Sequence, residues 1–182
     1  MASEDVVMAG FGGQGLMAIG KILAKAAMEE GRHVTWLPSY GPEMRGGTAN
    51  CVVIIDDEPI GSPVAREPRG VIVMNKQSID KFEPTVKQGG VLIVNTSLID
   101  RKSTRSDVRV IYVAANELAE KEGAGKSANM VALGAYVGVM KTTSAVAVEH
   151  AIEENFKGKR GSLGDINVRA FRRGFEIGSA AA

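Results

Sequence analysis

The sequence Gly10-Phe11-Gly12-Gly13-Gln14-Gly15 lies between a short apolar run and a segment with helical periodicity. The run before it, residues 6–9, reads Val-Val-Met-Ala, which is typical of a buried parallel strand. After it, Leu16, Ile19 and Leu23 recur on one face of a helix. A strand, a tight glycine turn and a helix in this order make a loop whose N–H groups and helix dipole favour a bound anion.

The glycines of this loop have distinct expected roles. Gly10 permits the turn, Gly12 allows another backbone or a phosphate to approach closely, and Gly15 lets the helix pack against the strand. The second expected strand, 33–37, ends without the carboxylate that a dinucleotide-binding fold uses to bind ribose. Ordinary NAD binding is therefore disfavoured, and a packing role for the glycines alone is the alternative.

The composition limits the classes of protein to consider. A chain of 182 residues suggests one domain, 1–182, and 22 Lys+Arg against 21 Asp+Glu give a net charge of +1, which does not fit a nucleic-acid partner. Cys51 is the one cysteine, so no disulfide framework and no Cys-ligated cluster or zinc site is expected; we expect a small buried hydrophobe there. We see no signal peptide and no apolar stretch of membrane-spanning length, which favours the cytoplasm and no membrane contact.

The apolar runs predict a three-layer α/β/α fold, Rossmann-like, with a mostly parallel sheet. Strands are expected at 5–10, 33–37, 48–56, 71–74, 91–94 and 109–113, and helices at 14–30, 76–82, 114–122, 128–140, 144–155 and 164–178. A β-hairpin is expected where residues 57–58 turn into 59–63, which would make the sheet mixed. In the helix at 144–155, the inward residues are expected to be Val146, Ala147, Ala151 and Ile152.

A second candidate site is the stretch Pro38-Ser39-Tyr40-Gly41-Pro42-Glu43-Met44-Arg45-Gly46-Gly47. Its two prolines and three glycines predict a loop with no regular element. It follows a strand, at the edge where open α/β sheets bind ligands, and should emerge beside the glycine loop. The alternative is a surface loop with a solvated ion pair. Asn95-Thr96-Ser97 follows another strand and could offer polar groups to the same crevice.

The segment 123–127, Gly-Ala-Gly-Lys-Ser, is similar to the end of a P-loop, but glutamate occupies the position of the first required glycine and a helix is expected in place of the preceding strand. Ser127 is better explained as a helix N-cap. The helix that follows is apolar on all sides, which predicts burial in the core or in an interface. Gly134 and Gly138 permit close helix packing, and Asn129 is a polar exception that needs partners.

Four segments together resemble the gamma subunit of 2-oxoacid:ferredoxin (acceptor) oxidoreductases, a module that is also a domain of the single-chain pyruvate:ferredoxin enzymes. They are residues 10–15, 38–47, 57–63 and 129–134. The resemblance extends over about residues 5–178, and the order and spacing of the segments fit.

The resemblance implies oxidative decarboxylation of a 2-oxoacid. Thiamine diphosphate attacks the keto carbon, carbon dioxide leaves, electrons pass through iron–sulfur clusters to ferredoxin, and coenzyme A accepts the acyl group. This chain has neither the cysteines for a cluster nor a recognisable thiamine diphosphate motif. Those groups are therefore expected on alpha, beta and delta partners, and this chain is not expected to be active alone. The isolated chain could form a homodimer.

The resemblance also implies a set of site residues that face the alpha/beta active site, where they would enclose the thiamine adduct or guide the phosphates of coenzyme A. The cofactor-binding candidates are Gly10, Gly12, Gly13, Gln14, Gly15, Ser39, Tyr40, Glu43, Arg45 and Asn129. Arg45 is the catalytic candidate, because its planar guanidinium can pair with a carboxylate or a phosphate. No metal ligand is expected.

The substrate is a separate question, because members of the family act on 2-oxoglutarate, pyruvate, branched-chain oxoacids or arylpyruvates. The sequence PSYGPEMRGG is most similar to the 2-oxoglutarate or branched-chain group, and 2-oxoglutarate is the expected substrate. The alternative function is a free-standing Rossmann-like nucleotide-binding module.

Overall fold

The structure is a computed structural model that describes residues 3–40, 47–158 and 163–182. Within this part of the chain, the strands are β1 (Glu4–Phe11), β2 (His33–Tyr40), β3 (Thr48–Asp56), β4 (Gly70–Val73), β5 (Val91–Asn95) and β6 (Arg109–Val113). The helices are α1 (Leu16–Glu29), α2 (Lys76–Phe82), α3 (Ala115–Lys121), α4 (Ala128–Met140), α5 (Ala145–Phe156) and α6 (Leu163–Ala180), with a 3-10 turn, η1, at Glu83–Thr85. No described helix combines the length and the apolar character that crossing a membrane requires.

The strands form one sheet in the order β2-β3-β1-β4-β5-β6. The pairs β1–β4, β4–β5 and β5–β6 are parallel, whereas β3 is antiparallel to both β1 and β2. The expected mixed, mostly parallel sheet is therefore confirmed. β1, α1 and β2 form a crossover, but β3 lies between the two strands of that unit. A strand inserted antiparallel at this place distinguishes the sheet from the usual Rossmann order.

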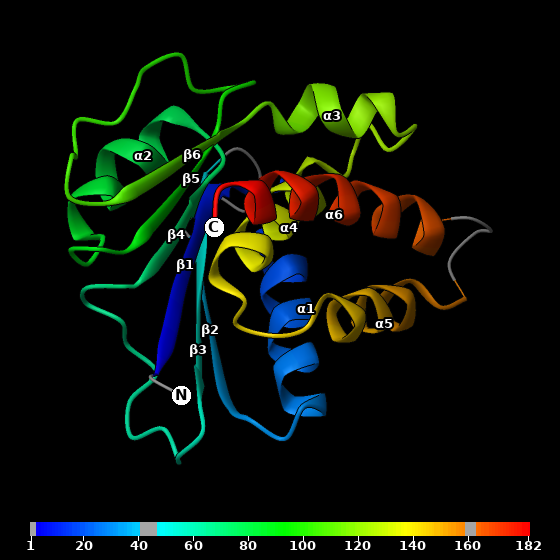
Figure 1. Ribbon diagram of the computed structural model, residues 1–182, viewed down its shortest axis with the longest axis horizontal. Coiled ribbons are helices and arrows are strands. Elements are labelled where there is room, and N and C mark those ends of the chain that lie inside the picture. Colours follow the sequence, from blue (N-terminus) through cyan, green and yellow to red (C-terminus); the bar gives the residue numbers. More distant parts are fainter. Residues whose placement is uncertain (1–2, 41–46, 159–162) are drawn as a thin grey trace.

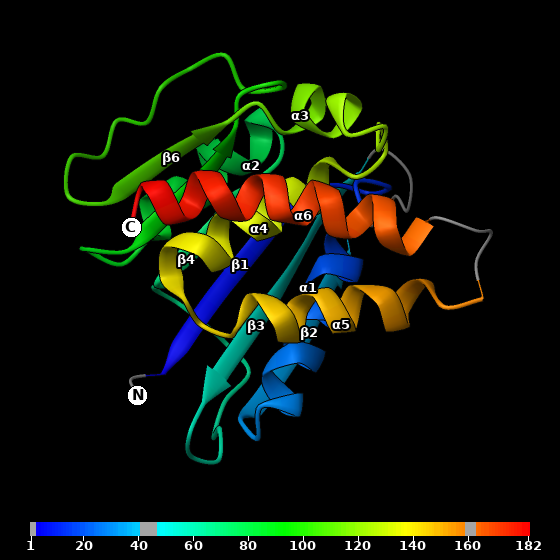
Figure 2. The same ribbon diagram turned by 45° about the vertical axis from the view of Figure 1, so that its right-hand side comes forward.

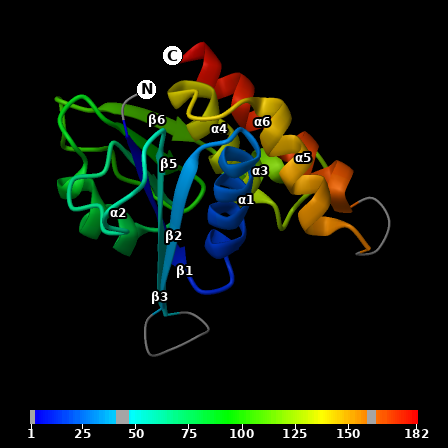
Figure 3. The ribbon, with the colours of Figure 1, turned by 90° about the horizontal axis from the view of Figure 1, so that it is seen from below.

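Helices cover both faces of the sheet. Figure 3 shows α2 on one face and α1, α4, α5 and α6 on the other. The larger apolar core lies on the side of α1 and α4, and a smaller one lies under α2. The two central parallel strands, β4 and β5, have helices on both faces, and they are therefore buried along their whole length and apolar except for Asn95 at the end of β5. The expected α/β/α layers are confirmed (Figure 1).

Helix α4 lies in the core. Every residue from Ala128 to Val139 is buried, and α6 lies across α4 in Figure 2. The two backbones approach so closely that a Cβ at Gly134 would lie 2.0 Å from the carbonyl oxygen of Phe171, and one at Gly174 would lie 1.9 Å from that of Val131. The prediction of close helix packing at glycine is confirmed, and between core and interface the structure assigns α4 to the core.

Three expectations about local structure are wrong. Residues 38–40 belong to β2 rather than to a loop, with Pro38 opposite Cys51. Since β2 is an edge strand, a proline without an N–H donor is tolerated there. No strand lies within residues 57–69, so the hairpin expected at 57–63 is absent; β3 pairs instead with β1 and β2. In α5, Val146 is 76% exposed, and Val148, two positions further and on the opposite side, is buried with Ala151 and Ile152.

Candidate functional site

The carboxyl ends of β1 and β4 meet at one edge of the sheet, and a pocket of about 440 Å³ opens there. This is the edge where open α/β sheets bind ligands. The glycine loop, the end of β4 and the start of α4 all contribute to it. Its lining residues are Gly13, Gln14, Met74, Asn116, Gly125, Lys126, Ala128 and Asn129.

Gln14 holds the glycine loop in shape. Its side-chain oxygen accepts a hydrogen bond from the backbone N–H of Phe11 at 2.6 Å, and its Nε2 donates to the carbonyl of Met74 at 3.2 Å. A Cβ at Gly10 would lie 2.2 Å from that oxygen, so glycine is needed there to admit the Gln14 side chain. The Gln14 amide therefore links the ends of β1 and β4, while Gly13, exposed with φ +98°, faces open space.

The hydrogen bond between Asn129 and Gly15 accounts for the burial of the Asn129 side chain and for the presence of glycine at position 15. Its Nδ2 donates to the carbonyl of Gly15 at 3.1 Å, which gives the expected polar exception in α4 a partner. Gly15 has φ +76°, and a Cβ there would lie 2.4 Å from that nitrogen. Gly15 therefore admits the Asn129 side chain between α1 and α4, a different role from the expected packing of helix on strand.

The second candidate segment, 38–47, ends beside the glycine loop, as expected. The N–H of Gly12 donates to the carbonyl of Gly47 at 2.9 Å, which is the close approach of another backbone that was predicted for Gly12. Ser39 is exposed near the end of β2, opposite Asn50, and Tyr40 pairs with Ala49. Glu43 and Arg45, with the rest of 41–46, lie outside the described residues.

The segment 57–63 lies at the other end of the sheet. It follows Asp56, which is opposite His33 at the start of β2, and therefore leaves the sheet at the amino end of the parallel strands. Because β3 is antiparallel, its carboxyl end cannot share an edge with that of β1. Three of the four segments that carry the family resemblance thus meet at the glycine loop, and two of them, 10–15 and 129–134, also line the pocket. The segment 57–63 does neither.

Asn116 is a pocket residue that sequence reasoning missed, and Asn95 fixes its orientation. The Asn95 side-chain oxygen accepts from the N–H groups of Ala115 at 3.2 Å and Ser97 at 3.3 Å, which only an oxygen can do. Its Nδ2 must then donate to Oδ1 of Asn116, at 2.9 Å. The remaining amide group of Asn116 is therefore a hydrogen-bond donor. The polar residues expected after β5 gave the signal for this relay.

Lys126 belongs to the segment 123–127, whose sequence is similar to the end of a P-loop. The rejection of that motif agrees with the structure, since α3 precedes it where a P-loop has a strand. Lys126 is nevertheless exposed and lines the pocket. Ser127 occupies the N-cap position of α4 as expected, but its side chain makes no capping hydrogen bond. Within the part of the chain that the structure describes, none of the lining residues is acidic, so these residues present donors and one cation, which suit an anion.

The single cysteine is a packing residue. Cys51 is fully buried, its thiol donates to the carbonyl of Leu16 at 3.4 Å, and burial raises its pKa to about 12. The expected role of a small buried hydrophobe is confirmed. Among the described residues, no three His, Cys, Asp or Glu side chains are grouped so that they could hold a metal ion.

Comparisons with known proteins place this geometry in a family. The chain is 39% identical over 170 residues to the ketoisovalerate oxidoreductase subunit VorA of Methanothermobacter marburgensis, covering 93% of this chain but 35% of that protein. It spans about a third of the length of the VorA relatives it matches. It is 33% identical to the 2-oxoglutarate synthase subunit KorC of Methanocaldococcus jannaschii, over 96% of this chain and 93% of that one.

A solved structure is also similar. The keto/oxoacid ferredoxin oxidoreductase gamma subunit from Geobacter sulfurreducens PCA matches with a TM-score of 0.83 and 31% identity, over 97% of this chain and 99% of that one. The sequence pattern of the pyruvate ferredoxin/flavodoxin oxidoreductase family matches residues 5–177. The chain therefore belongs to the pyruvate ferredoxin/flavodoxin oxidoreductase family.

Proposed function

We propose that this chain is the gamma subunit of a 2-oxoacid:ferredoxin oxidoreductase and that its pocket at the carboxyl edge serves the complex's active site. The observation that carries the proposal is the convergence of three family-like segments. The loop at 10–15 is hydrogen-bonded to Gly47 through Gly12 and to Asn129 through Gly15. Segments far apart in sequence thus build one surface, which a packing role for the glycines alone would not require.

The pocket fits the phosphate groups of coenzyme A. The donors available are the amide of Asn116, oriented by Asn95, and the exposed ammonium of Lys126. Among the lining residues that the structure describes, no acidic side chain lies beside these donors. Coenzyme A supplies the thiol that takes the acyl group, and this chain's residues would bind and orient its phosphates. Arg45 remains the candidate for pairing with a carboxylate or a phosphate.

The complex's other groups are assigned to partners. With Cys51 buried as its single cysteine, the chain offers no ligand set for an iron–sulfur cluster. Thiamine diphosphate and the clusters would reside on alpha, beta and delta subunits, which pass electrons to ferredoxin. This chain then contributes to the shape of the site and is inactive alone.

We propose 2-oxoglutarate as the substrate, which is supported by the 33% identity to a KorC subunit along nearly its whole length. A branched-chain oxoacid is the second candidate, because the VorA relative is 39% identical. The two substrates differ in charge at the distal end, so an assay with both separates them. A free-standing nucleotide-binding module is the alternative in which no partner is needed.

The test is reconstitution of the complex from this chain and its alpha, beta and delta partners. We expect 2-oxoglutarate- and coenzyme-A-dependent reduction of a viologen dye, lost when this chain is omitted. Higher activity with 3-methyl-2-oxobutanoate would assign the branched-chain substrate instead. Full activity without this chain would overturn the proposed function, as would tight nucleotide binding by a chain that associates with no partner.

Point variants test the pocket itself. Lys126→Ala should raise the KM for coenzyme A by about threefold to tenfold, because one charge-assisted contact to a phosphate is lost, and should leave the KM for the oxoacid unchanged. Lys87→Ala, an exposed lysine beyond the pocket, is the matched control. Equal KM values for coenzyme A in both variants would remove Lys126 from the site. Arg45→Ala is expected to lower activity sharply.

A further inference from the structure

Two side chains at the end of β5 hold the first turn of α3, the helix that carries the pocket residue Asn116. The Oδ1 of Asn95 accepts from the N–H of Ala115 at 3.2 Å, and the hydroxyl oxygen of Ser97 accepts from the N–H of Asn116 at 3.0 Å. The Ser97 hydroxyl in turn donates to the carboxylate of Glu117. The N-cap position of α3 holds an alanine, which cannot make such bonds, so the end of β5 caps this helix instead.

Asn95 and Ser97 act on different parts of Asn116. Ser97 contacts the backbone N–H and fixes the position of the residue, whereas Asn95 donates from Nδ2 to the Asn116 Oδ1 at 2.9 Å and fixes the direction of the side-chain amide. Asn95 itself is 1% exposed, and it cannot turn over because two N–H groups hold its oxygen. The polarity of the Asn116 amide is therefore set by backbone N–H groups two hydrogen bonds away.

The nitrogen of the Asn116 amide is open to the carboxyl-edge pocket. Asn116 is half-buried and lines that pocket. Among the described residues, no acceptor receives a hydrogen bond from its Nδ2, and this nitrogen is not one of the buried, unpaired side-chain atoms. A donor with accessible surface and a fixed direction is thus available to a ligand oxygen.

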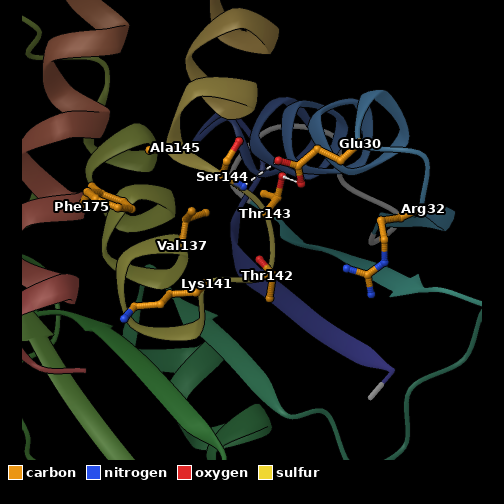
Figure 4. A pocket seen from close by; sticks show the side chains of 9 residues that line it. All are labelled: Glu30, Arg32, Val137, Lys141, Thr142, Thr143, Ser144, Ala145 and Phe175. Carbon is orange, nitrogen blue, oxygen red and sulfur yellow. Dashed lines mark hydrogen bonds between the residues drawn. The ribbon is translucent and has the colours of Figure 1, made fainter. Parts of the chain in front are cut away.

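A larger pocket, of about 510 Å³, lies where α1 and α4 end and α5 begins (Figure 4), but two of its charged side chains are already paired. The Glu30 carboxylate accepts from the hydroxyl of Thr143 at 2.5 Å and from the N–H of Ser144 at 2.9 Å. The buried Arg32 guanidinium lies 2.5 Å from the carboxylate of Asp57. These charges serve groups of the protein itself, whereas the Asn116 amide is left for a ligand.

We propose that Asn95 is a positioning residue of the carboxyl-edge pocket, because it holds the Asn116 amide with its nitrogen toward the ligand and so makes this wall a donor for phosphate oxygens. The inference deepens the proposed function and rests on it for the identity of the ligand, coenzyme A. The exposed ammonium of Lys126 supplies charge from a flexible stem, whereas the fixed amide donates in one direction. An amide oxygen in its place would set an acceptor against the phosphate.

The substitution that tests this is Asn95→Asp, which keeps the shape but has two acceptor oxygens. The Asn116 amide must then turn over to donate to it, and its oxygen would face the pocket. The probe is inorganic pyrophosphate, which carries the diphosphate of coenzyme A without its organic parts, in an NMR titration of the 15N-labelled full-length chain.

We expect the side-chain NH2 signals of Asn116, identified by their loss in Asn116→Ala, to shift saturably in the wild type. In Asn95→Asp these signals should no longer respond to pyrophosphate, and the dissociation constant should rise by about tenfold or more. If the buried carboxylate prevents Asn95→Asp from folding, Asn95→Ala replaces it. The freed amide then takes both orientations, and binding should weaken severalfold.

Two controls separate positioning from added charge and from a general loosening of α3. In the Asn116→Ala background, Asn95→Asp should weaken binding clearly less than in the wild type, because only the added charge then acts. Ser97→Ala removes hydrogen bonds to the same helix turn but keeps the bond from Asn95 to Asn116, and it should weaken binding by at most about threefold.

Equal losses of binding in Asn95→Asp and Ser97→Ala would overturn the proposal, as would an equal effect of Asn95→Asp with and without the Asn116 side chain. A wild-type chain that does not bind pyrophosphate would overturn it too. In the reconstituted complex, Asn95→Asp should raise the KM for coenzyme A more than it lowers kcat. Full activity of the complex without this chain would overturn the proposed function and leave the binding results standing.

Discussion

The side-chain amide of Asn129 donates to the carbonyl of Gly15 at 3.1 Å, joining the first turns of α4 and α1 across 114 residues of sequence. The buried helix at the centre of the core is thereby fastened to the glycine loop at the edge of the sheet. The Cβ of any other residue at position 15 would collide with this amide. The geometry of the candidate site and the packing of the core are therefore coupled at one hydrogen bond.

Gly15→Ala tests this coupling. Both Gly15 and Gly31 have φ near +78°, at +76° and +79°, but a Cβ at Gly31 meets open space. Gly31→Ala should therefore cost about 1–2 kcal/mol of unfolding free energy from backbone strain alone, and Gly15→Ala clearly more. Urea unfolding measures both. In the double variant Gly15→Ala/Asn129→Ala, the side chain with which the new Cβ would clash is removed. Equal losses of unfolding free energy in the single variants Gly15→Ala and Gly31→Ala would contradict the contact between Gly15 and Asn129.

Gly174→Ala should destabilise the protein by about 1–3 kcal/mol or more, because its Cβ would lie 1.9 Å from the carbonyl oxygen of Val131 and force α6 away from α4. Gly164→Ala in the same helix is the control: its Cβ would make ordinary contact at 3.8 Å with Glu153. There the better helix propensity of alanine should stabilise by about 0.5–1 kcal/mol. Thermal unfolding of the two variants should shift in opposite directions.

Gln14→Ala should loosen the glycine loop, because it leaves the N–H of Phe11 and the carbonyl of Met74 without their side-chain partner. The expected loss is about 1–3 kcal/mol in urea unfolding. Gln77→Ala, at an exposed position of α2, should change stability by less than about 0.5 kcal/mol. If both substitutions have the same small effect, the amide is not a structural link between β1 and β4.

Glu83 gives a pH dependence with a defined sign. Burial raises the pKa of its carboxyl, but hydrogen bonds from Ser103, Arg101 and the N–H of Thr104 outweigh burial and lower it below the ordinary 4.5. A carboxylate whose pKa is lowered by folding stabilises the protein above pH 4.5, and this contribution is lost as the pH falls through the lowered pKa.

The variant Glu83→Gln isolates this contribution. It should be less stable than the wild type by about 1–3 kcal/mol at pH 7 in urea unfolding, and the gap should narrow below pH 4.5. Glu67→Gln, at an exposed glutamate, serves as the control at both pH values. A gap that widens on acidification would show that the carboxylate is not held in its charged form by these donors.

Cys51 should be inert in the native protein. With its pKa raised to about 12 by burial, only about one thiol in ten thousand is ionised at pH 8, and no solvent reaches it. In native buffer, a disulfide reagent such as Ellman's should label only a small fraction of the chains over hours. In urea it should promptly label the one thiol of every chain. Rapid labelling of the native chain would contradict the burial of β3.

The order of strands and helices could be predicted from sequence because apolar periodicity and glycine punctuation are local signals. The strand before the loop, α1 after it and the buried α4 all follow from side chains within a few residues of one another. The edge at which the loop and the segment ending at Gly47 meet was also predictable, since parallel strands present their carboxyl ends together. The family resemblance depended on these same local segments.

Pairing between distant segments was decided by the tertiary structure. The insertion of β3 between β1 and β2 places 57–63 at the far edge, and Pro38 is accommodated because β2 has one free side. The direction of the Asn116 amide depends on Asn95, and the pocket in Figure 4 depends on how the ends of α1 and α4 and the start of α5 lie beside one another. Local sequence determines which elements form, whereas hydrogen-bond partners and pockets arise from contacts between residues that local periodicity does not relate.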